Sequence, residues 1–398
     1  MDENEIYEMS PVQLDNKTLS IDDFKKIYGE DISNAIDINT WRIGENLAEL
    51  YPIIENELIH AKRDEIKTHQ TFRETVFPRI KEIINVPHAG LNKEIKSQEI
   101  IEKIHRGFLF NGAVTACGSV SAIYDSIPIS ITQIGVCLVN YQGQHGSYSH
   151  RLFRRDLRHK SDDPIKEAID LIEKRKEDDL VGENKTKLST LAIRGIKSYA
   201  ERAILLEKSN SNWILGRGTP TPYELMTGFW ASRKEMKDHS IELMKKMVLE
   251  HKRFVYVQSS ERNPGLWTFG NALYPFEYLI MDTLEDKLTN MVEVGGTRGE
   301  FRESYESFAK EVGSKIVIGV YKVSKLSPPQ IFYSHIDNIQ IAASIAMADS
   351  ALQLHQGTPM LLDLADSLCK NAFGKSDFIA SIEHAYTKAE ILIQTEKL

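Results

Sequence analysis

The sequence has few cysteines and no long apolar run. Its 398 residues include three cysteines, Cys117, Cys137 and Cys369, and no Cys-x-x-Cys pair. We therefore expect neither a disulfide framework nor a structural zinc site. The longest apolar runs, within 131–139 and 315–321, are far shorter than the roughly 20 residues of a membrane-spanning helix. The acidic N-terminus lacks the basic start and apolar stretch of a secretory signal, so the sequence favours a cytoplasmic protein without membrane contact.

Several motifs of nucleotide-binding and hydrolytic enzymes are also missing. No Gly-Lys-Ser or Gly-Lys-Thr follows the glycine-rich stretches 216–224 and 293–301, and no G-x-G-x-x-G follows a predicted strand. ATP hydrolysis by this chain is therefore not expected. A Gly-x-Ser-x-Gly elbow is absent too, and a hydrolase built on Cys117 or Ser119 has no support from the sequence.

The charge balance is acidic, with one local exception. The formal net charge is -8, from 49 Lys and Arg against 57 Asp and Glu. Such a chain does not coat nucleic acid with its whole surface, because unspecific affinity comes from neutralising phosphates. The segment 150–160 is basic, with Arg151, Arg154, Arg155 and Arg158 around a single acid, Asp156. It is a candidate phosphate-binding face, and a solvated strand end explains it equally well.

The order of predicted elements indicates a mixed α/β protein. Residues 1–105 are charged with helical periodicity, and we treat them as a helical N-terminal region. Three β-branched and aromatic runs between 107 and 157 predict consecutive antiparallel strands. A helix over 188–208, strands near 212–217, 252–260, 314–324 and 328–336, and C-terminal helices from 338 onward follow. This order matches a ribonuclease H-like core over 106–398, distinct from a doubly wound sheet.

Nucleases of that architecture need two or three carboxylates around Mg²⁺ or Mn²⁺, which prefer oxygen ligands. The middle of the first strand, where such a carboxylate is expected, reads "VTACGSVS", with Cys117 before a predicted Gly118-Ser119 turn. Cysteine is a poor ligand for Mg²⁺. Asp125 lies eight residues further on and could serve only if the hairpin turned inward; an exposed turn is the simpler interpretation.

Acidic and histidine residues elsewhere provide further candidates. Glu201 and Glu207 lie on different faces of the predicted helix, and Glu201 is next to its apolar side. Glu201 is therefore the better candidate for a partly buried carboxylate, with a surface pair to Arg202 or Arg194 as the alternative. His335 and Asp337 share a face by their spacing of two, but a solvent-facing pair at a strand end explains them as well.

Four stretches together resemble the NurA family of DNA-end-processing nucleases, which work with the hexameric translocase HerA. They are the first strand with Gly118-Ser119, the Glu201 helix followed by "NWILGRG", the strands "VYKVSKLSPPQIFYSHID", and the closing "GTPMLLDLADSLCK". The resemblance covers about 111–388. It implies a ribonuclease H-like fold, Mn²⁺ or Mg²⁺ as cofactor, DNA as substrate, a homodimer and a HerA-like ring ATPase as partner.

Position by position, the resemblance leaves most of the family's metal site without its usual residues. The first metal aspartate falls on Cys117, the second on Gly216 or Arg217, the late tyrosine on Thr358 and the histidine on Asp366. Only the glutamate keeps its residue type, at Glu201. The resemblance thus makes Glu201 and Asp366 the catalytic candidates. Glu201 is also a metal candidate, together with Asp125 from its place in the predicted hairpin, and Arg217 in its glycine-rich loop joins the basic segment as a candidate DNA contact.

Three functions remain open from the sequence. The first is a NurA-like subunit for DNA end processing, repair or antiphage defence, with the two-metal site degenerate and with DNA guided by Arg151, Arg154, Arg155 and Arg158. The second is an assembly protein that bridges partners without DNA contact. The third is an active metal-dependent nuclease whose site is displaced to Asp366, Asp363, Asp125 and His335. The helical region 1–105 could then provide dimer or partner contacts.

Overall fold

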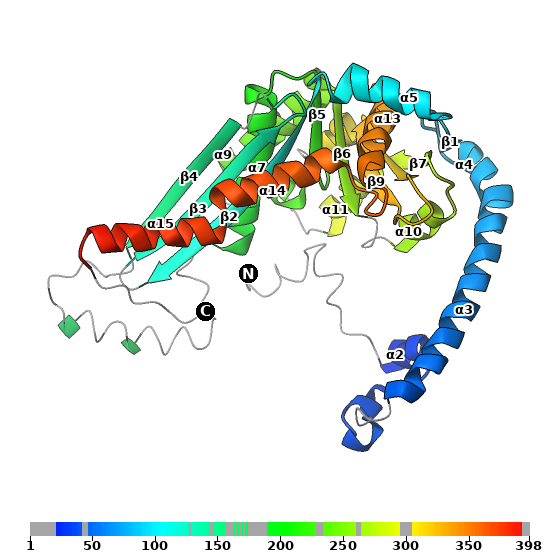
Figure 1. The fold of residues 1–398 in the computed structure, drawn as a ribbon, viewed down its shortest axis with the longest axis horizontal. Coiled ribbons are helices and arrows are strands. Elements are labelled where there is room, and N and C mark those ends of the chain that lie inside the picture. The colour runs from blue at the N-terminus through cyan, green and yellow to red at the C-terminus, as the bar shows by residue number, and fades with distance from the viewer. Residues whose placement is uncertain are drawn as a thin grey trace.

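The computed structural model of the chain describes residues 21–41, 47–126, 129–143, 147–156, a few positions between 163 and 173, and 189–227, 234–259, 264–294 and 305–391. Within these residues the strands form one mixed sheet of nine, in the order β1-β7-β8-β9-β6-β5-β2-β3-β4. Helices lie on both faces of this sheet (Figure 1). No helix in these ranges is both long enough and apolar enough to cross a membrane.

One half of the sheet has the predicted ribonuclease H-like order. Three strands form an antiparallel meander: β2 (Val114–Ser126), β3 (Ile129–Val139) and β4 (Ser147–Asp156). The chain continues through α7 (Thr190–Lys208) and returns as β5 (Trp213–Arg217), parallel to β2, and then as β6 (Phe254–Ser259), parallel to β5. The mixed α/β class and these five strands confirm the sequence-based prediction.

The predicted turn at Gly118 and Ser119 is wrong, because β2 continues without a break and pairs with β3 from Ala116 to Ser126. Glycine is needed at 118 for another reason. A Cβ atom there would lie 2.6 Å from the carbonyl carbon and oxygen of Ala365, which belongs to α14 (Met360–Phe373). The glycine therefore marks the place where a helix crosses the strand at close range.

The other half of the sheet is antiparallel. Its strands are β9 (Gln330–His335), which pairs with β6, then β8 (Ile316–Lys322), β7 (Glu277–Thr283) and the short edge strand β1 (Gly90–Asn92). β8 and β9 were predicted from their bulky apolar residues. β7 and β1 were not predicted.

Helices on the two faces enclose separate apolar cores. On one face, α7, α8 (Tyr223–Thr227), α9 (Lys234–Lys245) and α11 (Glu285–Val294) cover a core that includes Leu205, Met244 and Phe254. On the other, α5 (Gln98–Ile104), α13 (Ile339–Ser350) and α14 cover a core that includes Ala342 and Leu361. A smaller core lies between α4 (Phe77–Ile83) and α10 (Pro264–Asn271), and α15 (Lys375–Lys388) follows α14.

Short helical turns connect or extend these elements. In the described part of the chain, the π-helical turns are Phe72–Val76, His105–Leu109, Lys246–His251 and Ala309–Gly313. The 3-10 helices described there are Ile32–Ala35, Ile38–Thr40, Ile336–Asn338 and Ala351–Gln353.

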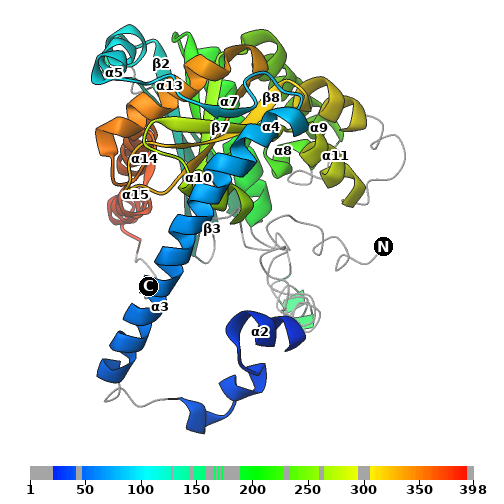
Figure 2. The ribbon, with the colours of Figure 1, turned by 90° about the vertical axis from the view of Figure 1, so that its right-hand side faces the viewer.

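An N-terminal arm leads away from the sheet. It comprises α2 (Ile21–Tyr28), the first two 3-10 helices and the 25-residue helix α3 (Leu47–Thr71), as Figures 1 and 2 show. The chain joins the core after α3, where Arg73 donates to both carboxylate oxygens of Glu277 at 2.7 and 3.3 Å and Phe77 is buried. The region expected to be helical thus supplies both this arm and, through β1, one edge of the sheet.

Candidate functional site

The candidate site lies where β2 and β5 diverge. Ala116 and Leu215 are the last paired residues of these strands, and from there β2 continues along β3 while β5 continues along β6. α14 crosses β2 at Gly118 and contributes acidic residues to the place where the strands separate. α7 contributes Glu201 from the other face. The strands β2 and β5 and the helices α7 and α14 therefore bring together the positions at which the sequence resemblance expects a nuclease site.

Arg217, the last residue of β5, forms ion pairs with two carboxylates of α14. Its Nη2 lies 2.6 Å from Oδ1 of Asp363, and its Nε lies 3.0 Å from Oδ2 of Asp366. The two acids are three residues apart on one helix, so they share a face. Burial raises the pKa of Asp366, while the guanidinium of Arg217 and the more distant Lys370 lower it. The cation at the end of β5 thus holds this acidic pair together.

Asp363 has further hydrogen bonds that fix its orientation. Its Oδ2 accepts from Nε2 of Gln353 at 2.6 Å and from Oγ1 of Thr358 at 3.2 Å. Both oxygens of Asp363 are therefore engaged by donors of the chain itself. Thr358, the position on which the family's tyrosine falls, takes part as one of these donors.

Glu201 occupies a partly buried position on α7 beside β2. Its Oε1 accepts a short hydrogen bond from Oγ of Ser119, and its Oε2 lies 3.9 Å from Nη1 of Arg202. Burial raises the pKa of Glu201, whereas Arg202, Ser119 and Lys197 lower it. The candidate from the sequence does point into the site, and Glu207 is exposed.

Cys117 lies in the apolar core behind this group. Its side chain is buried, and burial raises the pKa of its thiol well above the usual range. The thiol is therefore protonated at neutral pH, which makes it a poor nucleophile and a poor ligand. Cys137 and Cys369 are also buried and carry free thiols.

The charged side chains of the candidate site are better suited to bind an arginine than to bind Mn²⁺ or Mg²⁺. Three carboxylates, Glu201, Asp363 and Asp366, are accompanied by four cations: Arg202, Arg217, Lys197 and Lys370. A pair of divalent ions needs an excess of oxygen ligands that have no other partner. Across the residues that the structure describes, no three His, Cys, Asp or Glu side chains are arranged to hold a metal ion. Mn²⁺ or Mg²⁺ therefore does not fit the donor set at this place.

The remaining metal candidates lie elsewhere. Asp125 is in β2 six residues beyond Ser119, which at about 3.3 Å per residue places it about 20 Å further along the strand. His335 is the last residue of β9 and lies next to the beginning of β6, since its neighbour Ser334 pairs with Val255. Arg217 pairs with Val257, further along β6. The structure thus brings together Asp363 and Asp366 but does not bring Asp125 or His335 to them.

The basic segment lies on the outermost strand, β4. Arg151 and Arg154 are exposed there, and because side chains alternate along a strand they lie on opposite faces of the sheet. Arg151 lies over the ring of Phe153, 5.3 Å from its centroid. Arg155 is within β4, although its side chain is outside the described set, and Arg158 lies outside the described residues. The predicted basic cluster is therefore divided between two faces at this edge.

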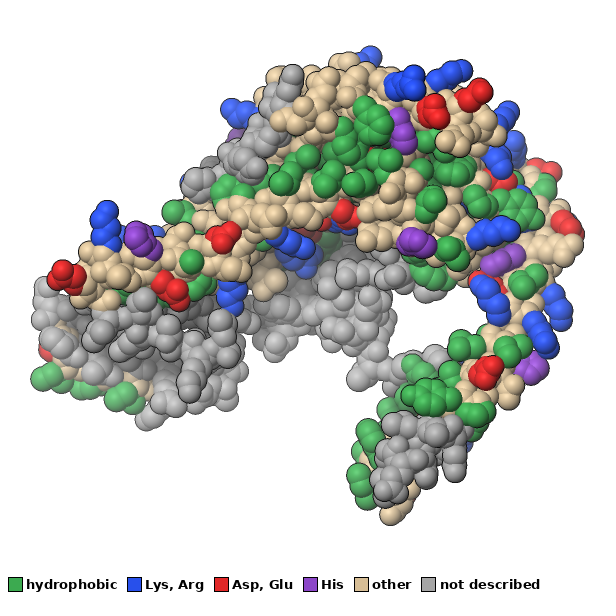
Figure 3. Space-filling model, viewed as in Figure 1, with side chains coloured by type: hydrophobic (Ala, Val, Ile, Leu, Met, Phe, Trp, Pro, Cys, Tyr) green, Lys and Arg blue, Asp and Glu red, His purple; other side chains and the backbone are tan. Residues whose placement is uncertain are grey.

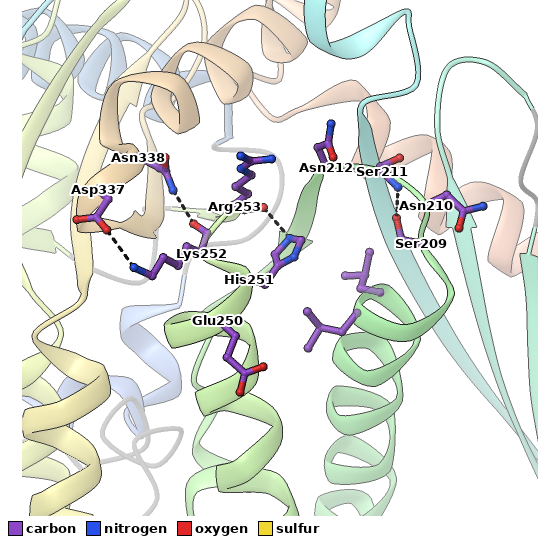
Figure 4. A pocket seen from close by; sticks show the side chains of 12 residues that line it. Ser209, Asn210, Ser211, Asn212, Glu250, His251, Lys252, Arg253, Asp337 and Asn338 are labelled. Atoms are coloured by element: carbon purple, nitrogen blue, oxygen red, sulfur yellow. Dashed lines mark hydrogen bonds and ion pairs between the residues drawn. The ribbon is translucent and has the colours of Figure 1, made fainter.

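A surface pocket of about 630 Å³ lies at the other end of β5 and β6. Figure 4 shows its polar lining from residues 209–212, 250–253 and 337–338. Lys252 Nζ lies 3.4 Å from Asp337 Oδ2, and Asn338 donates to the Lys252 carbonyl at 3.0 Å. Several of its polar groups are thus paired with one another, and of the candidates from the sequence the pocket contains Asp337.

Sequence reasoning missed three contributors to the site. Ser119 was considered as a nucleophile and as a turn residue, Asp363 as part of a displaced metal site, and Arg217 as a phosphate contact and as one of two positions for the family's second metal aspartate, but none of them as a partner within the site. The signal that could have identified Arg217 is its position after "WILG" at the end of a strand, where the resemblance expects a carboxylate. At such a position an arginine lies close to acidic residues of the neighbouring elements, and here these are Asp363 and Asp366.

Comparisons with known proteins found likenesses among solved structures, at low sequence identity. No protein-family model matches the chain, and no curated protein matches it either. Among solved structures, the NurA nuclease from Sulfolobus solfataricus is similar over 86% of this chain and 99% of its own, with 10% sequence identity and a TM-score of 0.43. NurA bound to dAMP and manganese is similar over 81% and 92%, with 8% identity and a TM-score of 0.39.

A more distant likeness is to endonuclease V from Bacillus subtilis. It extends over 80% of this chain and 94% of that one, with 13% identity and a TM-score of 0.28. The ribonuclease H-like order of the fold rests on the sheet of this chain itself, from β2 to β6. Likenesses at this level say nothing about activity, so the chemistry has to be judged from the residues of this chain.

Proposed function

We propose that this chain is a NurA-like DNA-processing subunit whose two-metal nuclease site is degenerate. The observation that carries the proposal is the pairing of Arg217 with both Asp363 and Asp366, at 2.6 and 3.0 Å. A guanidinium held in this way competes with any cation for the same oxygens. Cys117, buried and protonated, adds no ligand. The fold is kept, and its usual metal-binding positions are used for internal ion pairs.

The proposed task is to hold DNA for a partner rather than to cut it. We infer contacts to phosphates from Arg151, Arg154, Arg155 and Arg158, and a HerA-type hexameric ATPase and a second copy of this chain as partners in the cytoplasm. Arg217 is the least suited of the five arginines to bind phosphate, because two carboxylates already neutralise it. DNA end processing, repair and antiphage defence are processes in which such a complex would act.

A cleavage assay tests the loss of chemistry. Linear double-stranded DNA is incubated with Mn²⁺ or Mg²⁺ and the wild type or Glu201→Ala, each with and without a HerA-type ring ATPase. We expect no metal-dependent cleavage by the wild type in either case. Cleavage by the wild type that disappears in Glu201→Ala would show an active metal site and refute the proposal.

A binding assay tests the DNA contact separately. Arg154→Ala/Arg155→Ala should weaken binding at low salt and reduce the slope of log K against log salt by about 2, since each phosphate contact contributes about one unit. The matched control is Lys103→Ala/Arg106→Ala, which removes the same charge near α5, far from β4 in Figure 1. An unchanged slope in the first variant would exclude β4 as the DNA contact. Absence of any gel shift by the wild type at low salt would favour an assembly protein without DNA.

A further inference from the structure

The arm exposes a large share of the apolar side chains on the surface. Of the 26 large hydrophobic residues that are exposed among those the structure describes, 12 lie between Ile21 and Ile66. Figure 3 shows hydrophobic side chains gathered over this part of the molecule. Every described side chain from Tyr51 to Asp64 of α3 is exposed. A helix that packs on nothing gains little stability from its apolar face, since helices in proteins are stabilised mainly by such packing.

Four apolar residues of α3 have heptad spacing. Tyr51, Ile54, Leu58 and Ala61 are separated by three, four and three residues, and the next position of the series is the charged Glu65. This is the spacing of the a and d positions that form the seam between two paired helices. Tyr51, Ile54 and Leu58 are 68%, 52% and 64% exposed, so the seam is open to a partner along the described part of the helix.

We propose that α3 pairs in parallel with α3 of a second copy of this chain. The inference rests on the self-association included in the proposed function and identifies the surface that would mediate it. In a parallel pair, a g residue of one helix faces the e residue five positions later on the other. With Tyr51 at a, Glu57 is a g residue and Lys62 an e residue, so each helix offers the charge that the other lacks.

The symmetry and the charges favour a second copy over another occupant. A two-fold axis along the seam forms the Glu57 to Lys62 contact twice, which is the self-complementarity that a homodimer requires. In an antiparallel pair the g positions face one another and so do the e positions, so the unfavourable contact of Glu57 with Asp64 offsets the favourable contact of Glu55 with Lys62. Lys62 pairs with Glu65 of its own helix but is 68% exposed, so its amine can reach a neighbouring helix.

The test is sedimentation velocity of the full chain over a series of concentrations. We expect a dimer for the wild type and a dissociation constant at least tenfold higher for Ile54→Asp, which places a charge in the seam. Ile53→Asp is the matched control, because Ile53 is the same residue type, 53% exposed, and lies at position c, outside the seam. Circular dichroism of both variants shows that each is folded.

Charge exchange tests the pairing and its direction. Glu57→Lys should weaken the dimer, and Glu57→Lys/Lys62→Glu should restore it. A monomeric wild type, or equal effects of Ile54→Asp and Ile53→Asp, would overturn the proposal. If the dimer were restored by Glu55→Lys/Lys62→Glu and not by Glu57→Lys/Lys62→Glu, the helices would pair in the antiparallel orientation and the proposed parallel orientation would be wrong. Since β4 is not changed, DNA binding measured on Ile54→Asp separates failure of this interface from failure of the proposed function.

Discussion

Replacement of Arg217 by alanine should destabilise the protein by an amount that depends on pH. The guanidinium contacts Asp363 and Asp366 at 2.6 and 3.0 Å, with side chains 44%, 34% and 30% exposed. Since solvent screens groups this accessible, each pair contributes about 0.5–1 kcal/mol. The two acids, three residues apart on α14, then repel each other by a few tenths of a kcal/mol more. We expect Arg217→Ala to lower the free energy of unfolding by about 1–2 kcal/mol near pH 7.

The pH dependence follows from Asp366. Burial raises its pKa and Arg217 opposes that shift, so the variant raises the pKa of Asp366 further. A carboxyl group whose pKa is higher in the folded than in the unfolded state destabilises the fold where it is ionised. The effect of the variant through Asp366 should therefore be complete near pH 7 and disappear well below about pH 4, where this carboxyl is protonated in both the folded and the unfolded state.

Urea unfolding of the wild type, Arg217→Ala and Arg217→Lys at neutral pH and at acid pH measures this effect. Arg217→Lys keeps the charge but loses the fork that reaches two carboxylates at once, so its loss should be intermediate at neutral pH. An Arg217→Ala variant as stable as the wild type near pH 7 would refute the reasoning. A loss of equal size at both pH values would attribute the effect to packing of the arginine stem instead of its charge.

Three further predictions concern the same part of the fold. Mn²⁺ should raise the unfolding midpoint of Arg217→Ala, whose two carboxylates are released, but not that of the wild type; an equal rise in both would show that the arginine does not block a metal. Gly118→Ala should cost about 2 kcal/mol or more in urea unfolding, because its Cβ would overlap the Ala365 carbonyl, whereas Gly107→Ala, with nothing within 4 Å of the added atom, should cost nothing. Burial raises the pKa of Asp349 to about 6 although Tyr141 and the amide of Leu361 donate to it, so stability should fall as the pH rises from about 4 to 6, and Asp349→Asn should flatten that part of the curve.

The sequence predicted the elements with strong local patterns. β2, β3, β4, β8 and β9 alternate or concentrate bulky apolar residues, which is the local signature of a strand. β7 was missed although Glu277–Thr283 includes an apolar centre, because that run is short and is followed at once by a charged helix. β1 has only three residues and is a strand only because β7 lies beside it. Short pairings of this kind depend on tertiary context rather than on local preference.

The composition of the candidate site was only partly visible in the sequence, and the roles of its residues stay predictions. Glu201 and Asp366 were identified through a resemblance, and the structure places both where β2 and β5 diverge. The partner of Asp363 could not be inferred, since Arg217 lies 146 residues earlier in the chain and no periodicity links the two. The basic segment was visible as composition, but its division between two faces appears only once the register of β4 against β3 is known.

The pairing of β1 with β7 also affects how the chain can fold during synthesis. Gly90 pairs with Ile280, so β1 cannot pair with β7 until about 190 more residues have been synthesised. At about 5–20 residues per second this takes about 10–40 s. Throughout that interval Phe77 and Ile80 of α4 lack the partners that come from later in the chain, such as Ala272 and Leu279. This part of the nascent chain is therefore prone to wrong associations, and a chaperone that binds the first hundred residues would protect a segment whose partner strand is made much later.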